Sequence, residues 1–312
     1  METMKAVRMQ SYGGPEVLVY EDTPRPEPQP GEVLVQVYAA AINGIDWKIR
    51  DGELQRIFSF QLPMILGSDA AGVVAAVGEG VTTFQVGQEV YGMMERSRSG
   101  SFAEYAIASA DALAPKPQSL SYLEAASIPA VALTAWQALF DKGNLSNGQT
   151  VLIHGAAGGV GIFAVQLAKW KGARIIATAS ASNVNAVREL GADEIIDYQT
   201  TPFEKIVKGV DVVLDIMGGD TRARSWQVLK PNGILVSTVP PPPTAPDGLR
   251  GEMLMMQARG SELLEISKLL EAGQLRTIIE RVFPLNETAQ ALELNKAGHT
   301  HGKIVVQVVS NL

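Results

Sequence analysis

The sequence predicts an α/β protein in which a β domain is followed by a domain built around a parallel, doubly wound sheet. Three observations predict this class. The first third of the chain contains short strand patterns separated by glycine turns. From residue 151 onward, strand and helix patterns alternate. A glycine cluster lies between the first of these later strands and a helix pattern, which is the setting of a phosphate-binding turn.

Composition limits the classes of function. The 312 residues suffice for one large or two ordinary domains, and 46% hydrophobic with 19% charged residues is typical of a globular chain. A net charge of −7 argues against nucleic acid or an anionic membrane as partner. Because cysteine is absent, the chain has no disulfide, no thiolate nucleophile and no cysteine-ligated zinc. No apolar signal core follows the first residues, so we expect a cytoplasmic protein.

The first domain is predicted to consist of strands joined by turns. Apolar patterns predict strands over 5–9, 17–20, 33–37, 70–77 and 88–91. Proline stands at alternate positions over 24–30, which makes a stiff connector that cannot join the interior of a sheet. Short strands with frequent glycines indicate a compact barrel or sandwich.

The pattern changes near Ser121, and residues 124–140 predict helices. Strands and helices then alternate over 151–154, 160–170, 173–178, 183–190, 194–197, 202–208, 210–215, 221–229 and 233–239. A helix over 261–271 and a strand over 303–309 follow. Because the chain ends in a strand, we assign 1–122 and 273–312 to the β domain and 123–272 to the parallel-sheet domain. A ligand cleft is expected at the carboxyl ends of the parallel strands.

Residues 151–161, VLIHGAAGGVG, form the most informative short motif. Between the strand and the helix pattern that starts at 160, Gly158, Gly159 and Val160 are the residues expected to bind the cofactor. Glycine lets backbone N–H groups approach a pyrophosphate, and the helix N-terminus supplies partial positive charge. Ala156 stands where the dinucleotide fingerprint has its first glycine, so the bare motif is also compatible with a turn that merely packs helix on strand.

Longer motifs carry a family resemblance over nearly the whole chain. They are YGGPEVL near the start, AINGIDWKIRDG at 41–52, LGSDAAGVVAAVGEGV at 66–81, HGAAGGVGIFAVQLAK at 154–169, LGADEIIDY at 190–198 and HGKIVVQV at 301–308. The chain resembles the medium-chain dehydrogenases/reductases, and among them it is most similar to the zinc-free quinone oxidoreductases and 2-alkenal (enone) reductases. The resemblance implies a GroES-like β domain, a Rossmann domain, a nicotinamide cofactor and a homodimer.

The chain departs from the zinc-dependent branch at the positions of the catalytic zinc ligands. Where that branch carries a cysteine, a His-Glu pair and a third ligand, this chain has Asn43, Ser68 with Asp69, and Ala130. The lobe of four cysteines is also missing. We therefore expect an enzyme without a metal, for which reduction of an electron-poor acceptor is favoured over oxidation of an unactivated alcohol.

The choice of nicotinamide cofactor is predicted from charge. An NAD-binding Rossmann fold places an acidic residue about 20 residues beyond its glycines, whereas this chain has no Asp or Glu between Asp141 and Glu189. We therefore expect NADPH. The resemblance places Thr178, Ser180 and Tyr198 at the adenosine phosphate. Alternatively, the polar residues after Ser180 serve only to cap the next helix.

Catalysis is expected to depend on positioning, since the cofactor carries the hydride. Asn43, Asp46 and Lys48 are the strongest polar candidates, and the resemblance puts Lys48 beside the cofactor, where it would stabilise negative charge on a carbonyl oxygen. Alternatively, Asp46 and Lys48 form an ordinary surface pair at the end of a strand. Asp69 either orients this segment or is a turn residue. The prolines at 240–243 would form a stiff lip near the substrate.

The expected function is therefore the NADPH-dependent reduction of a quinone, or of the C=C bond of an enal or enone. An enoyl-thioester reductase is one alternative, and it would need a basic entrance for which Arg96 and Arg98 are the candidates. A non-catalytic NADPH-binding or redox-sensing protein is the other. The polar segment 43–48 argues against the second alternative.

Overall fold

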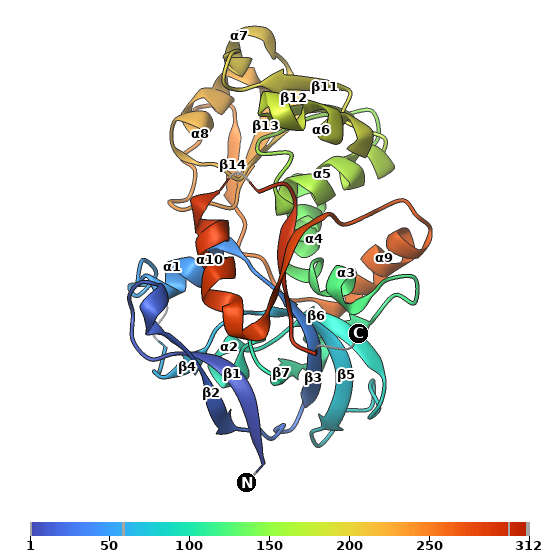
Figure 1. Ribbon diagram of the computed structural model, residues 1–312. Coiled ribbons are helices and arrows are strands. Elements are labelled where there is room, and N and C mark those ends of the chain that lie inside the picture. Colours follow the sequence, from blue (N-terminus) through green and yellow to red (C-terminus); the bar gives the residue numbers. More distant parts are fainter. Residues whose placement is uncertain (1, 58–59, 299, 310–312) are drawn as a thin grey trace. The chain divides into compact units, whose positions relative to one another are not determined.

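The computed structural model describes residues 2–57, 60–298 and 300–309 (Figure 1). The chain forms two compact units. Unit 1 comprises Met1–Ala130, Ala258–Ala272 and Thr277–Leu312. Unit 2 comprises Val131–Gln257 and Gly273–Arg276.

Unit 1 contains two sheets. One runs in the order β2-β1-β4, and the other runs β15-β16-β3-β5-β6-β8, with β7 also paired to β3. Neighbours are antiparallel except β15 and β16. The strands are β1 (Thr3–Met9), β2 (Leu18–Pro24), β3 (Glu32–Ala41), β4 (Met64–Ile65), β5 (Asp69–Val77), β6 (Glu89–Met93), β7 (Tyr105–Ser109), β8 (Leu113–Pro115), β15 (Ile279–Pro284) and β16 (Lys303–Gln307).

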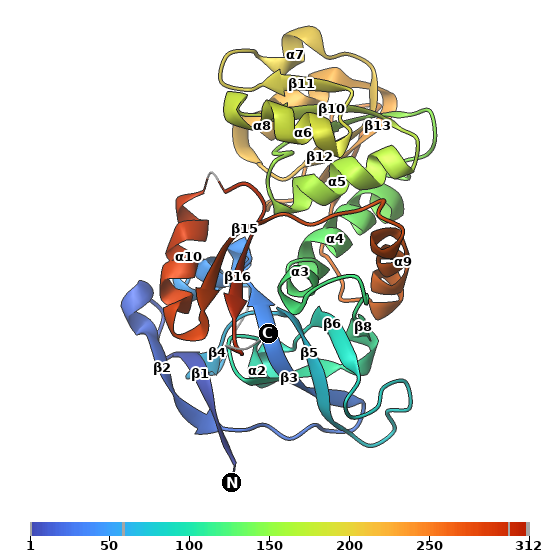
Figure 2. The ribbon, with the colours of Figure 1, turned by 45° about the vertical axis from the view of Figure 1, so that its right-hand side comes forward.

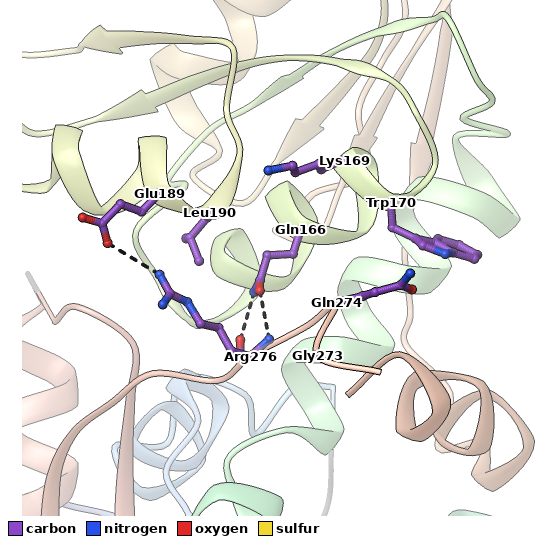
Figure 3. A pocket seen from close by; sticks show the side chains of 8 residues that line it. All are labelled: Gln166, Lys169, Trp170, Glu189, Leu190, Gly273, Gln274 and Arg276. Atoms are coloured by element: carbon purple, nitrogen blue, oxygen red, sulfur yellow. Dashed lines mark hydrogen bonds and ion pairs between the residues drawn. The ribbon is translucent and has the colours of Figure 1, made fainter. Parts of the chain in front are cut away.

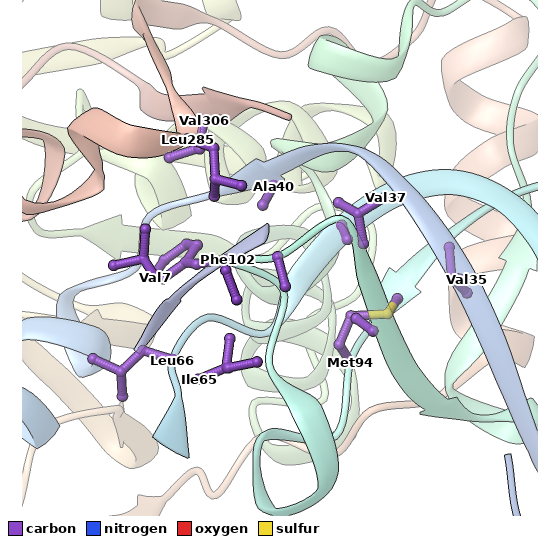
Figure 4. Close-up of a cluster of buried hydrophobic side chains, with 14 of the residues drawn as sticks. Val7, Val35, Val37, Ala40, Ile65, Leu66, Met94, Phe102, Leu285 and Val306 are labelled. Atoms are coloured by element: carbon purple, nitrogen blue, oxygen red, sulfur yellow. The ribbon is translucent and has the colours of Figure 1, made fainter. Parts of the chain in front are cut away.

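A single apolar cluster joins the early and late parts of unit 1 (Figure 4). Val35 and Val37 of β3 are fully buried in it, with Phe102 from the loop before β7. Val306 of β16 enters the same cluster. Burial of this apolar surface explains why the end of the chain returns to the first unit, as predicted from the final strand.

The helices of unit 1 are short. They are α1 (Gly44–Arg50), α2 (Arg96–Ser99), α3 (Tyr122–Ala126), α9 (Gly260–Glu271) and α10 (Thr288–Ala297). Helix α10 packs along β16, as Figures 1 and 2 both show. Single 3₁₀ turns cover Pro15–Val17, Ala110–Ala112 and Leu285–Glu287 in this unit.

Helix α9 belongs to unit 1, whereas the expected boundaries had assigned 261–271 to the parallel-sheet domain. The buried hydroxyl of Tyr91 in β6 donates to the carbonyl of Leu263 at 2.9 Å and lies 2.8 Å from the hydroxyl of Ser267. The apolar side of α9 also packs against β8. Only the crossing segment Gly273–Arg276 groups with unit 2.

Unit 2 is a parallel sheet with strand order β11-β10-β9-β12-β13-β14. This order reverses between β9 and β12, which is the switch point of a doubly wound nucleotide-binding sheet. The strands are β9 (Thr150–Ile153), β10 (Arg174–Ala179), β11 (Glu194–Asp197), β12 (Val210–Asp215), β13 (Leu229–Ser237) and β14 (Arg250–Met253). The predicted parallel, doubly wound architecture is confirmed.

Helices connect the strands of unit 2 and cover its sheet. They are α4 (Pro129–Trp136, continued by a π-helix over Gln137–Lys142), α5 (Gly159–Trp170), α6 (Val184–Leu190), α7 (Phe203–Ile206) and α8 (Gly219–Ser225), with 3₁₀ turns over Ala181–Asn183 and Trp226–Val228. Helices α5 and α6 lie side by side (Figure 2). A pocket of about 550 Å³ lies where α5 and α6 end and the segment Gly273–Arg276 passes (Figure 3).

Candidate functional site

The glycine turn leads from β9 to the N-terminus of α5 at the carboxyl edge of the parallel sheet. Gly155 has φ +63°, a left-handed conformation that favours glycine. A Cβ at Gly161 would collide with the carbonyl oxygen of Gly155, so the turn packs against the first turn of the helix more closely than any other residue would allow. The sequence around Gly158 therefore folds as a tight strand-to-helix turn.

The N-terminus of α5 fits an anionic group. Gly158 is its N-cap, and no side chain of the described residues caps it. The backbone N–H groups of Gly159 and Val160 belong to the first helical turn, which has no intrahelical acceptors for them. With the partial positive charge of a 12-residue helix, this end can hold a pyrophosphate.

The three residues expected at the adenosine phosphate are placed differently from one another. Thr178 is buried, and its hydroxyl lies 3.1 Å from Nδ1 of His154. Ser180, just beyond β10, is half-buried, and its hydroxyl accepts a hydrogen bond from the side chain of Asn183 at 3.1 Å. Tyr198 follows β11 and is 53% exposed. Ser180 and Tyr198 thus present side chains at the surface of unit 2, whereas Thr178 faces its interior.

His154 ends the strand before the glycine turn and is an interior residue. Its Nε2 lies 2.9 Å from the hydroxyl of Ser225, and its ring packs edge-on against Phe203. Burial lowers the pKa of His154 to about 4, so the ring is neutral near pH 7. Both ring nitrogens are used within unit 2, and His154 has a structural role.

A buried ion pair follows β12, and the sequence analysis did not identify it. Asp215 accepts from the Nε of Arg222 at 2.8 Å and from the hydroxyl of Ser237 at 2.8 Å. Burial opposes ionisation of Asp215, but hydrogen bonds, first among them that from the Gly218 N–H, outweigh it and hold the pKa of Asp215 below its usual value. Arg222 also donates to the carbonyl of Pro241 at 2.5 Å, which fixes the start of the proline segment.

In unit 1, residues 44–50 form helix α1, whereas the surface-pair alternative placed Asp46 and Lys48 at the end of a strand. Asp46 is fully buried, which rules out the alternative of an exposed surface pair with Lys48. Its Oδ2 accepts from the backbone N–H of Asn43 at 2.8 Å, and its Oδ1 lies 3.6 Å from Nη1 of Arg96. Burial raises the pKa of Asp46 to about 6, against the opposing charge of Arg96.

Three of the positions that correspond to zinc ligands in the zinc-dependent branch meet at Asp69. Its Oδ2 accepts from the side-chain amide of Asn43 at 3.0 Å, and its Oδ1 accepts from the backbone N–H of Ala130 at 3.1 Å. Burial raises the pKa of Asp69. Asp69 therefore orients the Asn43 segment, as the first of the two interpretations held, and is not a simple turn residue.

Lys303, at the start of β16, completes this cluster and was missed by sequence reasoning. Its Nζ donates to Oδ1 of Asn43 at 2.6 Å and to the carbonyl of Ile42 at 2.7 Å. It lies 3.8 Å from Oδ2 of Asp69. Burial lowers the pKa of Lys303, and the carboxylates of Asp69 and Asp46 oppose that shift. The motif HGKIVVQV contains this lysine, but no local pattern indicates a partner 260 residues away.

Lys48 is the cation of α1 that faces outward enough to meet a ligand. It is half-buried, and its Nζ lies 5.4 Å from the centre of the Trp47 ring. The neighbouring cluster of Asn43, Asp46 and Asp69 fixes the start of the helix that carries it. In unit 1, then, an internal hydrogen-bonded network supports a helix with an accessible lysine.

Comparisons with known proteins assign this fold to a family. Residues 29–118 match the family described as alcohol dehydrogenase GroES-like domain, and residues 190–306 match that described as zinc-binding dehydrogenase. The chain is 34% identical to the mitochondrial NAD(P)H oxidoreductase RTN4IP1 of Mus musculus, over 90% of this chain and 82% of that protein. It is 33% identical to the 2-methylene-furan-3-one reductase of Solanum lycopersicum, over 98% of this chain and 79% of that protein. The solved quinone oxidoreductase of Coxiella burnetii shares 38% identity and a TM-score of 0.89, covering 99% of this chain and 100% of that one.

The chain belongs to the medium-chain dehydrogenase/reductase family. As a medium-chain dehydrogenase/reductase it is an oxidoreductase with a GroES-like domain and a Rossmann-like domain. The predicted family, fold and enzyme class are thereby confirmed.

In this medium-chain dehydrogenase/reductase, the positions that correspond to zinc ligands do not resemble a zinc centre, although one matching family is described as zinc-binding. Asn43, through its side-chain amide, and Ala130, through its backbone N–H, both donate hydrogen bonds to Asp69. Across the ranges that the structure describes, no group of three or more His, Asp or Glu side chains is placed to hold a metal ion. Within the same ranges, no helix has the length and apolarity needed to cross a membrane.

Proposed function

We propose that this chain is an NADPH-dependent reductase of quinones, or of the C=C bond of α,β-unsaturated carbonyl compounds. The observation that carries the proposal is a network of internal hydrogen bonds. It occupies the positions at which the zinc-dependent members of the family carry their zinc ligands. Asn43 is bound to Asp69 and Lys303 there, and Ala130 offers only its backbone. An electron-poor acceptor suits such an enzyme because its own carbonyl spreads the incoming charge and needs no Lewis acid. The names of the tomato and Coxiella relatives support this substrate class.

A bound nicotinamide supplies the hydride, and the residues of the chain bind and orient. The N–H groups at Gly159 and Val160 hold the pyrophosphate at the N-terminus of α5. Lys48 donates to the oxygen on which negative charge develops, as its accessible ammonium on α1 allows. Solvent supplies the final proton to the reduced acceptor. The task is mainly one of holding two reactants in line.

The preference for NADPH rests on the surface beyond β10. Ser180 and Tyr198 offer hydroxyl groups to a 2′-phosphate, and an acidic residue that would repel it is absent between Asp141 and Glu189. Of the nearest cations in sequence, Arg174 lies at the amino end of β10 and pairs with Glu194 at 3.3 Å, and Arg188 donates to the side-chain oxygen of Asn185 at 3.1 Å. Neutral donors therefore account for the proposed preference.

Neither alternative function is favoured by a particular contact. The basic entrance of an enoyl-thioester reductase would use Arg96 and Arg98. Arg98 bonds to Glu32 at 3.1 Å, and Arg96 lies beside the buried Asp46. A non-catalytic NADPH-binding protein would have no need of the fixed helix that carries Lys48.

Two further proposals concern the oligomeric state of the protein and its place in the cell. A homodimer follows from the family resemblance, and β14 offers an open sheet edge in unit 2 on which a second copy can pair. Analytical ultracentrifugation of the purified protein measures whether it is a dimer. Cytoplasmic residence rests on the absence of cysteine, whereas the mouse relative is named mitochondrial. Imaging of the tagged protein in its own cells determines the compartment in which it resides.

The test of function is NADPH consumption with a quinone and with an enone, by the unmodified protein and by Lys48→Ala. Turnover of the variant is expected to fall by about a hundredfold, because the charge on oxygen loses its donor. Lys296→Ala is the matched control, since Lys296 also lies over the Trp47 ring, at 5.8 Å, and should leave turnover unchanged. NADPH binding without consumption of either acceptor would indicate the non-catalytic alternative, and full activity of Lys48→Ala would remove Lys48 from the mechanism.

A further inference from the structure

Lys303 is a buried lysine that joins segments far apart in the sequence. Its side chain is 5% exposed. Its Nζ donates to Oδ1 of Asn43 at 2.6 Å and to the carbonyl of Ile42 at 2.7 Å, the two residues just before α1. Strand β16 begins at Lys303 and pairs with β3, whose end leads into α1. Lys303 therefore ties β16 to the segment before α1, beside the backbone hydrogen bond from the N–H of Ile42 to the carbonyl of Ile304 at 2.9 Å.

Asn43 connects Lys303 to the start of helix α1. Its side-chain oxygen receives Lys303, and its side-chain nitrogen donates to Oδ2 of Asp69 at 3.0 Å. Its backbone N–H donates to Asp46 at 2.8 Å. The orientation of the amide is thereby fixed, because the oxygen must face the ammonium and the nitrogen the carboxylate. With both ends of its amide occupied, Asn43 can shift only if Lys303 or Asp69 moves.

The charges of this cluster balance, although they are buried. Asp46 and Asp69 are both fully buried, and the cations beside them are Arg96 at 3.6 Å and Lys303 at 3.8 Å. Buried ion pairs add little net stability compared with apolar residues of the same volume, but removal of one partner is strongly destabilising. The pair of Lys303 and Asp69 therefore contributes to the geometry of the Asn43 segment rather than to the stability of the fold.

We propose that Lys303 is a positioning residue for the reduction: through Asn43 it fixes helix α1 and thereby holds Lys48 in place. The proposal rests on the function proposed above, because it assigns Lys48 to the reacting oxygen. Lys303 itself is inside the unit and touches no substrate. A small displacement of a charge-stabilising group costs catalysis far more than it costs folding.

The test uses a charge-balanced variant, Lys303→Met with Asp69→Asn. This double change removes one buried positive and one buried negative charge, so folding should be retained where Lys303→Met alone destabilises the unit. Turnover is expected to fall about tenfold to a hundredfold. Hydrogen exchange of the α1 amides, measured in the protein without nucleotide, is expected to become faster. This second readout does not depend on activity.

Lys296→Met is the matched control for the lysine change. Lys296 binds Asp51 at 2.5 Å, at the opposite end of α1, and is an exposed partner. It should leave turnover and the exchange of the first turn of α1 unchanged.

Each outcome decides between the two proposals. If the double variant folds, reduces acceptors at the normal rate and keeps α1 protected, Lys303 serves only charge balance and the positioning role is wrong. The proposed function does not depend on that result. If the unmodified protein reduces no conjugated acceptor, the proposed function is wrong, and the exchange measurement still decides whether Lys303 holds α1.

Discussion

His154 illustrates how far a single residue can be interpreted before its surroundings are known. It ends the strand before the glycine turn, a place that suits either a ligand contact or a core residue. The structure buries it and gives both ring nitrogens a hydroxyl partner, Thr178 and Ser225. Those hydroxyls lie 24 and 71 residues away, so no local pattern could have indicated them.

The burial of His154 predicts a dependence of stability on pH. Its pKa is lowered from 6.5 to about 4, so between these pH values the unfolded chain binds more protons than the folded one. Stability is therefore full above pH 6.5 and falls as the pH drops toward 4, by on the order of 3 kcal/mol. Urea unfolding of the unmodified protein and of His154→Gln over this range measures the difference. Their free-energy difference should shrink as the pH falls, and a constant difference would show that His154 is not buried neutral.

The comparison with His154→Gln is needed because the buried carboxyl groups of unit 1 change the stability with pH in the opposite direction. Burial raises the pKa of Asp46 from 3.8 to about 6, so its contribution to stability is lost as the pH rises through that range. Both proteins contain Asp46, and its effect cancels in the difference.

At the scale of residues, the resemblance identified Asn43, Asp46 and Lys48 because they stand in one segment. It could not identify Lys303 or Arg222, whose contacts are made through the tertiary fold. Their partners are backbone carbonyls and buried side chains, which leave no mark on the sequence.

At the scale of elements, long periodic patterns predicted the parallel sheet well. Helix α5 and strands β9 to β13 lie within a few residues of their expected ranges. The elements that were missed are mostly short: β4 has two residues, β8 has three, and α1 has seven with glycine at its start. Segments of this length form because neighbouring elements bury them, and their own propensity is a weak signal.

The end of β10 and the turn that follows carry the prediction on cofactor choice. The unmodified protein should prefer NADPH over NADH by about tenfold or more, ~1.4 kcal/mol, because Ser180 and Tyr198 offer hydroxyl groups and no Asp or Glu stands between Asp141 and Glu189. Ser180→Asp places a negative charge there and should narrow or reverse the preference. Steady-state kinetics with both cofactors measure it.

Ser180→Asn is the control for that substitution, because it has nearly the size of aspartate without the charge. It should keep most of the preference for NADPH. Equal use of both cofactors by the unmodified protein would show that this surface does not recognise the phosphate.

At the scale of the whole molecule, the return of the last strands to the first unit was predictable, but the membership of α9 was not. The final strand needs a sheet to pair with, and β3 provides it. Helix α9 instead follows a run of alternating strands and helices and looks like their continuation. Its contacts with β8 and with β6, among them the hydrogen bond from Tyr91 to Leu263 across 172 residues, place it in unit 1.

We propose that the whole molecule is a reductase that works without a metal ion, and one measurement tests that claim most directly. After exhaustive treatment with a chelator, the purified protein is assayed for NADPH consumption with a quinone and an enone, and for NADP⁺ reduction with saturated alcohols. We predict undiminished reduction of at least one conjugated acceptor, slow or absent oxidation of the alcohols, and no stoichiometric zinc by elemental analysis. Rapid alcohol oxidation that the chelator abolishes, with quinone and enone left untouched, would contradict the account.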